Sequence, residues 1–154
     1  FMAEDARVLQ DTTHSGFFGT QYLFEYLSAN GKAALAGDVA THEGCPGYFH
    51  MMDCGATTLW EAWNEKQCLN VHSNCHPMFG SVEQWMMRYL LGICVTADAI
   101  GCDRVRIVPH AVAGVTSASG WLDTPKGRIS VSWKLEGGKM QVEKSVPAGI
   151  TVLD

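Results

Sequence analysis

The chain is organised around the stretch Gly55-Ala56-Thr57-Thr58-Leu59-Trp60-Glu61-Ala62-Trp63, in which one carboxylate lies between two indoles. Sugar C–H groups pack on aromatic faces, and a neighbouring carboxylate can hold a sugar hydroxyl or a water. The pattern therefore indicates a sugar pocket around Glu61. The alternative is a helix in a protein core, with the tryptophans buried and Glu61 facing solvent. Composition alone favours that alternative.

A second informative stretch follows a polar segment, residues 64–74, that we expect to form a loop. It begins His76-Pro77-Met78-Phe79-Gly80-Ser81-Val82 and continues to Trp85. Its apolar residues recur at spacings of three and four, which predicts a helix from about Met78 to Cys94. The stretch that follows Gly55 is expected to be helical as well.

Together the two stretches resemble glycoside hydrolase family 78, the α-L-rhamnosidases. Residues 55–63 and 76–93 carry the resemblance, and Ser15-Gly16-Phe17-Phe18-Gly19-Thr20 and Pro46-Gly47-Tyr48 fall in the order that this family shows. It extends from about Thr13 to Pro147, whereas members of the family are several times longer. The resemblance implies the last helices of an (α/α)6 barrel followed by a small antiparallel, sandwich-like β domain.

The residue pattern before Gly55 predicts short helices. Thr20 is the expected N-cap of a helix that runs to about Asn30 and stops at Gly31. An Ala-rich run over residues 32–41 predicts a second helix, packed against the first as an antiparallel pair. Glycine and proline make residues 43–54 an irregular segment, which either packs in the core or lines the rim of a pocket.

Alternation of apolar and polar residues replaces the helical spacing after Ala99, and this predicts antiparallel strands. The expected strands are residues 105–108, 115–118, 129–135, 140–146 and 150–153. The sequence therefore predicts an α+β chain. We expect residues 1–98 to be the C-terminal part of the catalytic barrel and residues 99–154 to be a β domain.

The resemblance implies an inverting mechanism with Glu61 as the general base. In an inverting glycosidase, one carboxylic acid protonates the leaving oxygen while a carboxylate activates the attacking water. No motif for the general acid is present, since Glu4, Asp5 and Asp11 lack the right context. We therefore expect the chain to carry the base without the acid, and to be inactive by itself.

Four further residues are expected at the sugar site. The resemblance makes His76 a sugar contact, with a core histidine at a helix start as the alternative. Tyr48 stands where many relatives carry tryptophan. Trp60 and Trp63 flank the base and are expected to contact the substrate.

The composition narrows the classes of partner. With 11 basic and 16 acidic residues the net charge is −5, which argues against a nucleic-acid surface. No apolar run approaches the roughly 20 residues of a membrane span. Neither C-x-x-C nor H-E-x-x-H occurs, so we expect no metal site, and cleavage by two carboxyl groups needs no cofactor.

The six cysteines are expected to be mostly buried, reduced thiols. Cys68 and Cys75 bracket a short loop and are the best candidates for a disulfide. The first residues lack the basic start and apolar run of a signal peptide. Because the chain can come from a longer precursor, the cellular location stays open between cytoplasmic and secreted or periplasmic.

Three functions remain from the sequence. The first is part of an α-L-rhamnosidase that acts on terminal rhamnosyl groups, with the rest of the barrel supplied by a longer precursor or a partner chain. The second is a fragment that binds carbohydrate or a partner without hydrolysis. The third is another α/α-barrel glycosidase or lyase.

Overall fold

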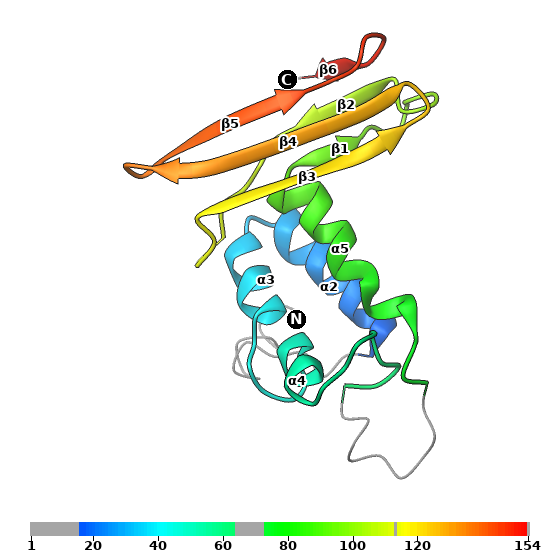
Figure 1. The fold of residues 1–154 in the computed structure, drawn as a ribbon, viewed down its shortest axis with the longest axis vertical. Helices are drawn as coiled ribbons and strands as arrows, with labels where there is room; N and C mark the ends of the chain where they lie inside the picture. The colour runs from blue at the N-terminus through cyan, green and yellow to red at the C-terminus, as the bar shows by residue number, and fades with distance from the viewer. Residues whose placement is uncertain (1–15, 64–72, 113, 154) are drawn as a thin grey trace. The chain divides into compact units, whose positions relative to one another are not determined.

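The computed structural model describes residues 16–63, 73–112 and 114–153. The chain divides into two compact units, with the division between Glu83 and Gln84. The first unit is helical and the second is mainly β (Figure 1). Within the described ranges no helix is both long and apolar enough to span a bilayer.

The first unit begins with a pair of packed helices, α2 (Phe17–Ala29) and α3 (Ala33–Ala40). Leu23, Phe24 and Leu27 are buried and form the inner face of α2, as the spacing of these apolar residues predicts. Gly31 adopts a left-handed backbone with φ of 72° and ends the helix, as expected. This tight turn places α3 directly against α2.

Two predictions for this region were wrong. Helix α2 starts at Phe17 and is flanked by Gly16, so Thr20 is not its cap. Thr20 lies inside the helix, where its buried hydroxyl donates to the Gly16 carbonyl oxygen at 3.0 Å. The expected irregular segment contains a short helix, α4 (Tyr48–Asp53), because a single helical turn can follow the helix-breaking glycines and proline.

The stretch after Gly55 is not helical, contrary to the prediction. Its backbone groups bond to a distant segment instead of to the preceding turn. The Glu61 N–H donates to the Ser73 carbonyl at 2.9 Å, and the His76 N–H donates to the Leu59 carbonyl at 2.8 Å. The two tryptophans of this stretch therefore lie in a segment of bends and turns.

The predicted helix from Met78 to Cys94 forms over residues 77–90, in three consecutive parts that differ in their hydrogen-bond pattern. They are a 3-10 turn η2 (Pro77–Gly80), a short α5 (Ser81–Trp85) and a π-helical turn η3 (Met86–Leu90). The helix ends before Ile93, which starts strand β1 (Ile93–Val95). Gly92 causes the stop, because its φ is 73° and a side chain there would meet the Val108 backbone at 2.1 Å.

The second unit contains two three-stranded sheets. Sheet A has the order β1-β2-β6, with β2 at Arg104–Ile107 and β6 at Thr151–Leu153. Sheet B has the order β3-β4-β5, with β3 at Ser117–Thr124, β4 at Gly127–Glu136 and β5 at Lys139–Ser145. Sheet B is antiparallel as predicted. In sheet A, strand β6 was wrongly predicted as antiparallel, since it pairs parallel to β2.

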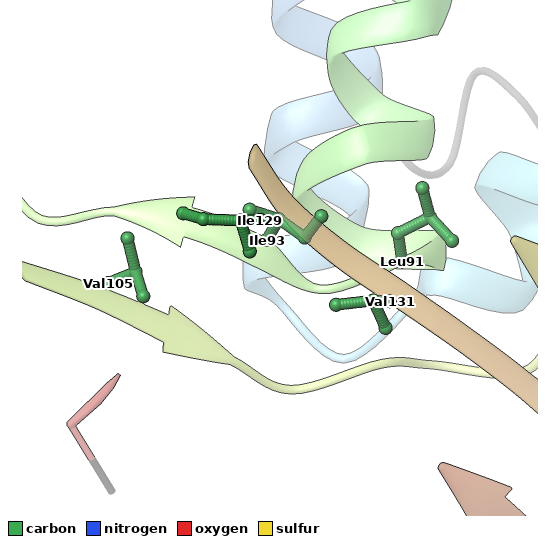
Figure 2. Close-up of a cluster of buried hydrophobic side chains, with 5 residues drawn as sticks. All are labelled: Leu91, Ile93, Val105, Ile129 and Val131. Atoms are coloured by element: carbon green, nitrogen blue, oxygen red, sulfur yellow. The ribbon is translucent and has the colours of Figure 1, made fainter. Parts of the chain in front are cut away.

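The core of the second unit is built from both sheets and the end of the helical segment. Figure 2 shows its buried side chains: Leu91, Ile93, Val105, Ile129 and Val131. Met87 and the partly buried residues of β3 and β6 pack around them. The Trp133 indole N–H donates to the Leu90 carbonyl at 2.7 Å, which ties sheet B to the helical segment. The unit is thus sandwich-like.

The described cysteines are not buried, which corrects the expectation. Cys45 and Cys75 are exposed, and Cys54, Cys94 and Cys102 are partly exposed. They lie in loops, at the end of α4 and in the short strand β1, where little protein covers them. Cys68, the expected partner of Cys75, lies outside the described residues.

Candidate active site

The site that the sequence indicates is built from two segments of the first unit that pair with each other. Besides the two backbone bonds at Glu61 and His76, the Thr58 hydroxyl donates to the Asn74 carbonyl. The Ser73 hydroxyl in turn bonds the Cys75 backbone at both its N–H and its carbonyl. The two sequence motifs are thus brought together by main-chain hydrogen bonds.

The carboxylate of Glu61 is held by this pairing. Its Oε2 atom accepts the Ser73 backbone N–H at 2.8 Å, and the residue is partly exposed. A backbone donor of this kind stabilises the negative charge of a carboxylate. Glu61 therefore has both polar support and access to water, which are what a general base needs.

Trp60 and Trp63 are largely buried, with 5 % and 8 % of their surface exposed. The Trp63 ring lies 3.9 Å from the Phe79 ring, centroid to centroid, and 5.0 Å from the Tyr48 ring, which it meets edge-on. Most of each indole is therefore engaged in packing, and the Trp63 ring joins the two motifs through Phe79. Their contact with substrate stays a prediction.

Tyr48 joins the same aromatic cluster from α4. Its hydroxyl donates to the Phe79 carbonyl at 2.8 Å, within the protein interior. Burial raises the pKa of the Tyr48 phenol well above its usual range, which keeps it neutral. The hydroxyl is thus committed to holding η2, the 3-10 turn that follows His76.

His76 precedes η2 and lies beside the ring of Phe17, with centroids 5.3 Å apart. Its Nδ1 atom is buried and makes no hydrogen bond within the described part of the chain. A buried nitrogen without a partner costs about 1–3 kcal/mol. This nitrogen can therefore take part in one further hydrogen bond, as donor or acceptor according to its tautomer.

Phe17 belongs to the site as well, although a role for it was not predicted from the sequence. It contacts Phe18, His76 and Phe79 through its ring. The signal was available, because Phe17 lies in the Ser-Gly-Phe-Phe-Gly-Thr motif. Glu4, Asp5 and Asp11, in which no motif for the general acid was found, lie outside the described residues. In the ranges that the structure describes, no cluster of three metal-ligating side chains occurs.

Two family models match successive parts of the chain. Residues 2–90 match the bacterial alpha-L-rhamnosidase 6 hairpin glycosidase domain. The chain belongs to the bacterial α-L-rhamnosidase family. Residues 95–153 match the C-terminal domain of the same enzymes. These matches confirm the resemblance and the expected order of a helical glycosidase part followed by a β domain.

Individual relatives agree with this family assignment. An alpha-L-rhamnosidase of Formosa agariphila is 32% identical over 143 residues, which cover 89% of this chain and 15% of the relative. One from Alteromonas sp. is 30% identical over the same length. The chain thus spans about 15% of the curated relatives it matches.

Solved structures show the same fold. The α-L-rhamnosidase of Dictyoglumus thermophilum has a TM-score of 0.89 at 28% identity, covering 97% of this chain and 17% of that one. The Streptomyces avermitilis enzyme, solved with L-rhamnose, has a TM-score of 0.88 at 26% identity, covering 97% and 15%. This α-L-rhamnosidase-family chain therefore has the helices and the β domain of much longer glycosidases.

Proposed function

We propose that the chain is part of an inverting α-L-rhamnosidase that removes terminal α-L-rhamnosyl groups from glycosides or polysaccharides. Glu61 is its general base. The observation that carries the proposal is that Glu61, held by the Ser73 N–H, lies on a segment paired with the one that carries His76, whose ring nitrogen is unmet. The choice of rhamnose as the sugar rests on the relatives, which are named α-L-rhamnosidases.

In the proposed reaction Glu61 takes a proton from a water that attacks the anomeric carbon of the sugar. Ser73 holds Oε2, and within the described ranges no hydrogen bond reaches Oε1. The proposal assigns to that oxygen the proton of the water. An inverting site needs its second carboxyl about 6.5–9.5 Å from the base, so that the water fits between them.

His76 is the proposed contact to a sugar hydroxyl, through the ring nitrogen that lacks a partner. Trp60, Trp63 and Tyr48 are proposed to form the aromatic wall of the sugar site. Since most of their surface is buried, each offers only a small part of its ring to the substrate. No cofactor is proposed, because the two carboxyl groups suffice for the reaction.

The rest of the barrel, including the general acid, is proposed to come from a longer precursor or a partner chain. Phe18, Tyr22 and Tyr26 support this, since they follow each other at intervals of four on α2 and are 63%, 61% and 43% exposed. A stripe of this kind marks a surface that another element covers. A division of the chain at about residue 98 stays a prediction.

An assay with an aryl α-L-rhamnoside tests the proposal, with NMR to identify the first-formed anomer. The full-length enzyme should release β-L-rhamnose, and the 154-residue chain alone should release none. Release of the α anomer would show that the enzyme retains the anomeric configuration, and would refute the inverting mechanism. A full-length protein that binds rhamnosides without cleaving them would support the non-catalytic alternative, and cleavage by elimination would indicate a lyase.

A further inference from the structure

The face of sheet B that points away from the core of its own unit is polar, with one large aromatic ring. Strand register places three rows of side chains on it: Ser117 with Lys134 and Gln141, Ser119 with Ser132 and Glu143, and Trp121 with Ser130 and Ser145. We call this the serine face. The opposite face carries Ile129 and Val131, which pack in the core.

The serine face is hollowed along its length. One hollow of about 520 Å³ is lined by the rows that start at Ser117 and Ser119. A second of about 370 Å³ is lined by residues of the rows that start at Ser119 and Trp121. They share Ser119, Ser132 and Glu143, so they form one continuous shallow groove across three strands. Its size is in the range of small-molecule sites.

Trp121 lies at one end of this groove and is held in place. The guanidinium of Arg128 lies 4.8 Å from the centre of its ring. Asp123 fixes that guanidinium with two hydrogen bonds, of 2.8 and 3.0 Å. Although 56% exposed, the indole is therefore oriented before any ligand arrives, which lowers the entropy cost of binding.

The chemistry of the groove selects its ligand. Serine hydroxyls both donate and accept hydrogen bonds, as sugar hydroxyls do, and an indole packs on sugar C–H groups. Lys134 is paired with Glu136 at 2.7 Å and Arg128 with Asp123, so the face does not present a cluster of unpaired cations to a polyanion. Serine and glutamate are depleted in protein interfaces, which disfavours a protein partner.

We propose that the serine face binds a neutral polysaccharide chain, at a site separate from the one that contains Glu61. Trp121 stacks on one sugar ring, while Ser119, Ser132 and Glu143 bond hydroxyls of the next. The site would hold the enzyme on its polymeric substrate while the catalytic site cleaves terminal groups. The inference rests on the lining of the groove and holds whether or not Glu61 is the base.

The test measures retardation of the full-length enzyme in gels that contain a rhamnan, an arabinoxylan or a galactomannan, all neutral polysaccharides. Excess L-rhamnose in every gel occupies the catalytic site. Trp121→Ala should weaken binding to the retarding polymer by about tenfold or more, the size expected for a binding hot spot. Ser132→Tyr, which fills the middle of the groove, should do the same.

Ile100→Ala is the matched control, since Ile100 is 81% exposed and lies outside sheet B. It should bind as the wild type does, and all three variants should keep the wild-type kcat on an aryl rhamnoside. Two results would overturn the proposal. One is equal retardation of wild type and Trp121→Ala by all three polymers. The other is a Trp121→Ala enzyme with a much lower Tm than the control, which would mean that another domain covers the face.

Discussion

The Oε2 atom of Glu61 accepts the backbone N–H of Ser73 at 2.8 Å, across twelve residues of sequence. The backbones of the same two residues bond in the opposite direction at 2.9 Å. Because both contacts use main-chain groups of Ser73, the position of the carboxylate depends on the path of that segment more than on the identity of its side chains. The proposed base is thus fixed by pairing of two segments.

Replacement of Glu61 by Gln in the full-length enzyme should lower kcat by about 10²–10⁴-fold, because the amide keeps the size of the side chain but cannot take a proton. Azide, which needs no deprotonation, should partly restore turnover of a substrate with an activated leaving group. Initial rates with an aryl α-L-rhamnoside measure both effects. Glu83→Gln, at an exposed position in α5, is the control. A Glu61→Gln enzyme with near wild-type kcat would end the assignment.

His76→Ala should lower kcat/KM by roughly ten- to a hundredfold, corresponding to the loss of one hydrogen bond to the substrate. The Tm should stay close to that of wild type, since Nδ1 of His76 bonds nothing in the described structure. The exposed His110 offers the control, His110→Ala. Activity that chelators abolish and zinc restores would make His76 a metal ligand and refute the prediction.

Tyr48→Phe should destabilise the protein by about 1–3 kcal/mol at neutral pH, because it leaves the buried Phe79 carbonyl without its donor. The pKa of Tyr48 is raised in the folded state, so the unfolded chain loses its phenol proton first as the pH rises. The stability of wild type should therefore fall above about pH 10. Tm values measured from pH 8 to 11 should converge for wild type and Tyr48→Phe. A constant difference would contradict the burial of the phenol.

Gly92→Ala should destabilise the second unit by about 2–4 kcal/mol, from left-handed backbone strain and a clash with Val108. Gly101→Ala is a matched control, because Gly101 also has a positive φ, of 59°, but open space around it. It should cost only about 1–2 kcal/mol. Denaturant unfolding of both variants separates the cost of backbone strain from the cost of the clash. Equal losses of unfolding free energy would show that the Val108 backbone moves to make room for the new methyl group.

Tyr22→Lys should have opposite effects in two contexts. In the 154-residue chain alone it should reduce aggregation, because it breaks the exposed stripe on α2. In the full-length enzyme it should lower the Tm, because the proposed barrel would bury the new charge. Light scattering and thermal unfolding measure the two effects. An unchanged full-length Tm would mean that no other part of the enzyme covers this face.

Local patterns predicted the elements whose partners lie close in sequence. Three such features could be predicted, since each depends on neighbouring residues: the apolar face of α2, its stop at Gly31 and the antiparallel pair of β4 and β5. The stretch around Glu61 was wrongly predicted as a helix that follows Gly55. Its backbone bonds go to residues 73–76, and no periodicity within the stretch itself reports that pairing.

The end of the helix at Leu90 likewise depends on contacts that the local pattern does not report. The spacing of three and four continues through Ile93, yet Gly92 turns the chain and Ile93 pairs with Ile107 instead. The parallel pairing of β6 with β2 was equally hidden, because alternation gives the face of a strand and not its direction. At the site, the identity of Glu61 and His76 came from the resemblance, while the unmet nitrogen of His76 required coordinates.

The second unit takes part of its core from the helical segment before its first strand. Leu91 and Met87 pack with Ile93, and the Leu90 carbonyl receives the Trp133 indole. A gene segment that began at β1 would encode both sheets but would lack Leu91 and Met87, and so would leave part of their shared core uncovered. Recombination could therefore transfer this β unit between enzymes only together with the last turns of the preceding helix. The two regions would be inherited jointly, even where their sequences are classed as separate domains.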